Sequence, residues 1–154
     1  MNKKIIILFI LLILPLKCLA LEITIKKISD LDKPWGSSFV SVNEIVVTEK
    51  SGLIKHVNLK NNKVKIINHN LNILEDGQGG LLDILYNEGK IYVSYSENRG
   101  NRKTSTSIAV GDFNKNKIIF KNIFQSDPPI ESGYHFGSRL VIKENFLFAS
   151  SGER

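Results

Sequence analysis

The amino-acid sequence predicts an all-β protein and, within that class, a β-propeller. After residue 20, no segment keeps a helical apolar period over three turns. Instead, polar turns feed hydrophobic strands in three similar units, whose first apolar strand residues are Ile45, Ile91 and Phe146. These residues are spaced by 46 and 55 positions, and a repeat of about 40–50 residues is typical of a propeller blade. Periodicity alone leaves a β-sandwich open as the alternative.

The first twenty residues have the pattern of a secretory signal peptide. Two lysines precede an apolar run at residues 5–14, and residues 18–20 place small side chains before a cleavage site after Ala20. A membrane anchor is the alternative, but the run is shorter than the about 20 residues of a membrane span, and Pro15 and Lys17 follow it. We therefore expect a periplasmic or secreted protein with no stable membrane span after cleavage.

The mature chain carries little net charge. The sequence has 21 Lys and Arg against 15 Asp and Glu, and three lysines leave with the leader, so 18 against 15 gives a net charge of +3. The remaining lysines are scattered among Asn and Ile, and we expect no nucleic-acid partner. Cys18 is the only cysteine and also leaves, which excludes a disulfide or a cysteine nucleophile. A lipoprotein anchored through Cys18 is disfavoured, because Lys17 stands where a small residue is expected.

Short runs rich in β-branched residues, each bounded by polar turns, mark the expected strands in chain order. The runs are residues 23–28, 44–48, 52–57, 63–67, 90–95, 105–113, 117–120, 138–142 and 145–149. Hairpins rich in Asn and Lys are expected at residues 60–63 and 114–117, near the end of the first two units. Residues 97–104 are expected to form an extra loop in the second unit.

These strands amount to about two and a half blades, whereas a closed propeller needs at least four. We therefore expect residues 21–154 to be the N-terminal part of a propeller domain, with two to three blades. A piece that assembles with other chains and a truncated, non-functional gene product are the alternatives.

Two glycine-rich stretches carry the side chains best suited to chemistry. Residues 76–83 (DGQGGLLD) present Gln78 and residues 134–140 (YHFGSRL) present His135, each just before a strand-like run. Glycine lets the backbone turn tightly and lets a ligand approach closely. The two residues are 57 positions apart, about one blade, so we expect them side by side at the mouth of the propeller channel. A histidine in such a place suits general-base catalysis.

Six motifs, in order, resemble those of the soluble aldose sugar dehydrogenases, the glucose/sorbosone dehydrogenase family that uses pyrroloquinoline quinone. The family patterns LxxPWG, LVTERxGRL, GQGGLLD, VYLSYS, HFGGRL and xGDR are similar to residues 31–36, 46–54, 77–83, 91–96, 135–140 and 151–154. The family fold is a six-bladed propeller, so the resemblance implies that this chain forms its first two to three blades.

The resemblance also implies the chemistry, which is oxidation of an aldose sugar at its anomeric carbon with a quinone or another electron acceptor. The family's base is the histidine of HFGGRL, which falls on His135, and its glutamine of GQGGLLD contacts the quinone and falls on Gln78. Asp83 is expected to fix blade geometry. The family's calcium ligands come from later blades, so no metal ligand is expected here and the chain alone is expected to be inactive. A non-catalytic propeller that binds glycans or protein partners is the alternative.

Two residues depart from the family pattern. Ser138 replaces the second glycine of HFGGRL. Tyr134 stands where the glucose-oxidising relatives carry an acidic residue, which leaves the preferred sugar open.

Overall fold

The computed structural model describes residues 22–153, so the leader and Arg154 lie outside the described residues. The signal peptide and its cleavage after Ala20 therefore stay predictions. The described residues contain no helix, and thus none long and apolar enough to cross a membrane. The strands are β1 (Pro34–Ser41), β2 (Glu44–Glu49), β3 (Ile54–Asn58), β4 (Val64–His69), β5 (Leu81–Asn87), β6 (Lys90–Asn98), β7 (Thr104–Asp112), β8 (Lys117–Ile118), β9 (Lys121–Gln125), β10 (Leu140–Lys143) and β11 (Phe146–Ala149).

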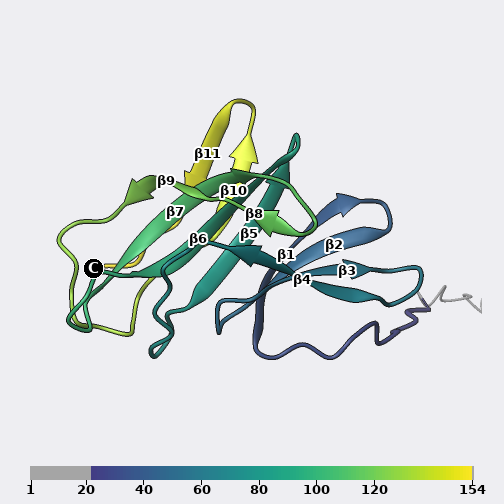
Figure 1. Ribbon diagram of the computed structural model, residues 1–154, viewed down its shortest axis with the longest axis horizontal. Helices are drawn as coiled ribbons and strands as arrows, with labels where there is room; N and C mark the ends of the chain where they lie inside the picture. Colours follow the sequence, from purple (N-terminus) through teal and green to yellow (C-terminus); the bar gives the residue numbers. More distant parts are fainter. Residues whose placement is uncertain (1–21, 154) are drawn as a thin grey trace, which may run out of the picture.

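The strands form three sheets that follow one another as propeller blades (Figure 1). β1 to β4 make an antiparallel meander, β5, β6, β7 and β9 make a second one, and β10 with β11 begin a third. The first strand of each sheet lies innermost. Gly36 of β1 packs against Asp83 of β5, and Asp83 in turn accepts the backbone N–H of Leu140 of β10. The propeller prediction is confirmed, and the sandwich alternative is not.

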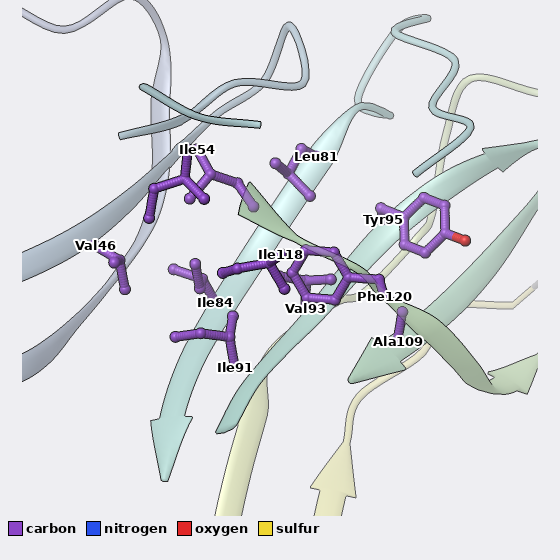
Figure 2. Packing of buried hydrophobic residues seen from close by; sticks show 11 residues of the cluster. Val46, Ile54, Leu81, Ile84, Ile91, Val93, Tyr95, Ala109, Ile118 and Phe120 are labelled. Carbon is purple, nitrogen blue, oxygen red and sulfur yellow. The ribbon is translucent and has the colours of Figure 1, made fainter. Parts of the chain in front are cut away.

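The main hydrophobic core lies between the first two blades (Figure 2). Ile54 of β3, Leu81 of β5 and Ile91 of β6 are fully buried there, and Ile118 of β8 is 1% exposed. Full burial of one such side chain stabilises the fold by about 1.5–3 kcal/mol. Packing between blades is therefore what holds each otherwise two-faced sheet in place.

The hairpin between β3 and β4 lies where its Asn and Lys residues predict it. The side-chain oxygen of Asn58 accepts the N–H groups of Lys60 at 3.0 Å and of Asn61 at 3.3 Å. Asn62 adopts a left-handed φ of 57°, a conformation that asparagine tolerates better than most residues. This turn chemistry sets the register that pairs Val57 with Val64.

The strand expected at residues 23–28 is wrong. Ile23 and Ile25 are 74% and 91% exposed, and no described strand pairs with this stretch. An alternating pattern becomes a strand only where a neighbouring strand and an apolar surface await it. β1 is instead the first strand of the meander, although its Pro, Gly and Ser residues resemble a turn. It forms because Gly36 donates its N–H to the buried hydroxyl of Thr48 at 2.9 Å.

The second Asn and Lys hairpin does not return the chain to β7 at once. β8 crosses to the first sheet and pairs in parallel with β4, with Asn68 opposite Lys117 and His69 opposite Ile118. The chain then pairs with β7 through β9, which the sequence did not indicate because all five of its residues are exposed. The extra loop expected at 97–104 is also shorter, since β6 and β7 are each nine residues long.

Candidate functional site

The two glycine-rich loops contact each other. The loop before β5 and the loop before β10 meet where the N–H of Gln78 donates to the carbonyl of Gly133 at 2.6 Å. Gly77 has a φ of 53°, and a Cβ there would lie 2.4 Å from the same carbonyl. Only glycine allows the two backbones to approach this closely. The glycines therefore bring the loops of successive blades together.

The structure joins the two residues that the sequence singled out. The side-chain Oε1 of Gln78 accepts the backbone N–H of His135 at 3.0 Å. His135 has a φ of 62°, an uncommon conformation for a non-glycine residue, and such residues cluster at functional sites. Both side chains are exposed. Because Gln78 uses its oxygen on this bond, its amide nitrogen remains as a donor for a ligand.

Glu153 is a site residue that the sequence reasoning missed. Its Oε1 lies 2.5 Å from Nδ1 of His135, and the two side chains are 81% and 54% exposed. The pKa of Glu153 is lowered by a hydrogen bond from its own backbone N–H and by the nearby charge of His135. The signal was present in the sequence, since an acidic residue occupies the third place of the closing SGER motif.

The stretch that carries Glu153 is pressed against the histidine loop. A Cβ on Gly152 would lie 2.2 Å from the carbonyl oxygen of His135, so only glycine fits there. The N–H of Ser138 donates to the carbonyl of Ser150 at 2.8 Å. In Figure 1 the end of the chain accordingly lies beside the loop that joins β9 to β10.

The contact with Glu153 fixes which nitrogen of His135 can do chemistry. A carboxylate accepts a proton, so Nδ1 carries the hydrogen and Nε2 keeps its lone pair. An imidazole oriented in this way can take a proton at Nε2, and the carboxylate stabilises the positive charge that results. The arrangement is that of a general base with an orienting acid.

Asp83 and Arg139 hold the inner strands beside this base. The buried carboxylate of Asp83 accepts the guanidinium of Arg139 at 3.1 Å and the N–H of Leu140 at 2.8 Å. The expected structural role of Asp83 therefore has a concrete form, which is a link from the second blade to the third. Ser138 lies between these contacts with a strained φ of 108°, and the hydroxyl of Ser94 fixes its carbonyl at 2.6 Å.

The site has the donors for an oxygen-rich ligand but not a metal centre of its own. Within residues 22–153, no group of three or more His, Cys, Asp or Glu side chains could hold a metal ion. The Gln78 amide and the His135 imidazole suit a ligand with carbonyl and hydroxyl oxygens, such as a quinone together with a sugar. A cavity of about 380 Å³ lies elsewhere, between β7, β9 and β11, and neither of these residues lines it.

Comparisons with known proteins point to one family. The family model described as Glucose / Sorbosone dehydrogenase matches residues 31–154. The aldose sugar dehydrogenase YliI of Escherichia coli (strain K12) is 29% identical over 133 residues, which cover 80% of this chain and 36% of that protein.

Solved structures share the fold. A crystal structure of a glucose dehydrogenase matches with a TM-score of 0.74 at 26% identity, covering 80% of this chain and 39% of that one. The PQQ-bound form of an aldose sugar dehydrogenase from Streptomyces coelicolor matches with a TM-score of 0.66 and the same two coverages. Its identity of 19% means that it shows the fold alone. The chain thus spans 36–39% of the length of these three relatives.

Proposed function

Because the chain belongs to the glucose/sorbosone dehydrogenase family, we propose that it supplies the base and one cofactor contact of a quinone-dependent aldose dehydrogenase. The observation that carries the proposal is the joining of three loops at one histidine. Gln78 accepts the N–H of His135, and Glu153 holds its Nδ1.

The reaction removes a hydride from the anomeric carbon of a cyclic aldose and a proton from its hydroxyl, which leaves a lactone. Nε2 of His135 accepts the hydroxyl proton, and the carboxylate of Glu153 stabilises the imidazolium that forms. Pyrroloquinoline quinone, when bound, supplies the acceptor for the two electrons that leave with the hydride. The amide nitrogen of Gln78 is the group of this chain that would hold it.

Calcium and the location of the protein belong to the same proposal. The family's calcium ligands come from later blades, so calcium would bind outside the described residues. The leader would export the protein to the periplasm or beyond, where a sugar and an electron acceptor are available to it.

The test is aldose-dependent reduction of a redox dye by the full-length protein, loaded with pyrroloquinoline quinone and calcium. His135→Asn should lower kcat by about 10²–10⁴-fold, the usual contribution of a general base. Gln78→Ala should weaken binding of the quinone. Gln125→Ala removes an exposed amide of β9, far along the chain from both loops, and serves as the matched control.

Two outcomes would count against the proposal. A wild-type protein that reduces no dye with any aldose would favour the non-catalytic propeller, in which glycan or protein binding persists in His135→Asn. A fully active His135→Asn variant would mean that another residue is the base.

A further inference from the structure

A large aromatic ring stands exposed beside the proposed base. The side chain of Tyr134 is 59% exposed, and its ring lies edge-on to that of His135, with centroids 6.4 Å apart and an interplanar angle of 70°. Two residues later, Phe136 is only 2% exposed and its ring lies under Gly79. The loop therefore anchors one aromatic side chain in the interior and presents the other to solvent.

The backbone that carries Tyr134 is fixed on both sides. Its own N–H donates to the hydroxyl of Ser132 at 3.3 Å. The preceding Gly133 accepts the N–H of Gln78 at 2.6 Å, and the following His135 donates to the side chain of Gln78 at 3.0 Å. Since tyrosine has only two side-chain torsions, holding its ring against a ligand costs little entropy. Tyr134 thus has the rigidity of a recognition residue.

We propose that Tyr134 is the specificity-determining contact for the sugar ring, and this inference rests on the proposed function. A pyranose has hydroxyl groups around its edge and an apolar face of C–H bonds. The hydroxyls suit the polar groups of His135 and Gln78, whereas the C–H face suits the flat face of an aromatic ring. With its C–H face on Tyr134, an aldopyranose can place its anomeric hydroxyl at Nε2 of the adjacent His135.

The ring, rather than the hydroxyl of Tyr134, makes this contact. Phenylalanine at this position should therefore preserve recognition, and alanine should remove it. The change should affect the binding of cyclic aldoses and not the proton transfer, because His135 and Glu153 are untouched.

The experiment compares steady-state kinetics of the full-length, quinone-loaded wild type with those of Tyr134→Ala and Tyr134→Phe, using glucose and xylose. Tyr134→Ala should raise KM for both aldopyranoses by about five- to tenfold, as expected for loss of an aromatic contact. Its kcat should change by less than about twofold, the signature of lost ground-state binding. Tyr134→Phe should keep both constants. Phe146→Ala, which removes a 66% exposed ring at the start of β11, is the matched control.

Quinone affinity is measured in parallel through the fluorescence of Trp35, the only tryptophan of the sequence, whose Nε1–H lies 3.4 Å from the hydroxyl of Ser138. Unchanged quinone affinity with a raised KM supports the inference. An unchanged KM in Tyr134→Ala overturns it, and so does weakened quinone binding in place of a raised KM. A wild type that oxidises no aldose contradicts the proposed function itself, before any Tyr134 variant is compared.

Discussion

At the scale of single residues, the contact between His135 and Glu153 matters for orientation more than for stability. Both side chains are more than half exposed, and exposed ion pairs contribute little to folding. The same contact decides which imidazole nitrogen faces a substrate. Its effect should therefore be visible in the rate of reaction and not in the melting temperature.

Glu153→Gln tests this directly. The variant should lower kcat by roughly one to two orders of magnitude with little change in KM, as is usual when the partner that orients a functional imidazole is removed. Glu131→Gln, which alters an exposed ion pair with Arg102, is the control and should be silent. Equal kcat values for wild type and Glu153→Gln would contradict the orienting role.

The pH dependence of this effect has a definite sign. The pKa of Glu153 lies below its usual value of 4.5, first because of its own backbone N–H and then because of His135. The carboxylate therefore stays charged at neutral and mildly acidic pH. The rate advantage of the wild type over Glu153→Gln should persist down to that range and be lost only as pH falls through the lowered pKa.

At the scale of elements, β8 ties the second blade to the first. It pairs with β4 rather than with its own sheet, and it places Ile118 in the core between the blades. The turn before β8 adds a second tie, because Nζ of Lys115 lies 2.7 and 2.8 Å from the two carboxylate oxygens of Glu44. His56, whose buried Nε2 has no hydrogen-bond partner, lies 3.6 Å from the same carboxylate.

Lys115→Met should weaken this tie in a pH-dependent manner. The hydrogen bond from Lys115 is the main cause that lowers the pKa of Glu44 below 4.5, against the opposing effect of burial. A lowered carboxyl pKa contributes stability that is present at neutral pH and lost as pH falls through it. The variant should therefore melt slightly below the wild type at pH 7 and together with it at pH 3.

The control for this measurement is Lys60→Met, in the hairpin between β3 and β4, because no ion pair involves Lys60 among the described residues. A Lys115→Met variant that loses the same stability at both pH values would show that the lysine acts through packing of its side chain.

At the scale of the whole molecule, the repeat was readable from the sequence and the exceptions to it were not. Polar turns before Ile45, Ile91 and Phe146 recur because each blade repeats the same local pairing. The crossing of β8 depends on a partner strand in another blade, about 50 residues away, which local patterns do not encode. Residues 23–28 fail for the converse reason, since their pattern finds no partner among the described strands.

The site was predictable to the extent that single loops carry it. Gln78 and His135 stood out because each lies among glycines. Their direct hydrogen bond, and the contact of His135 with Glu153, arise only when three loops of successive blades converge. No local signal in the loop of one blade specifies what the next blade places against it.

The central claim is that these converging loops form the quinone and sugar site, and a crystal structure of the full-length protein with pyrroloquinoline quinone and a sugar tests it most directly. The quinone should lie within hydrogen-bond distance of the Gln78 amide, and the anomeric oxygen of the sugar within hydrogen-bond distance of Nε2 of His135. A quinone bound away from both residues would contradict the account.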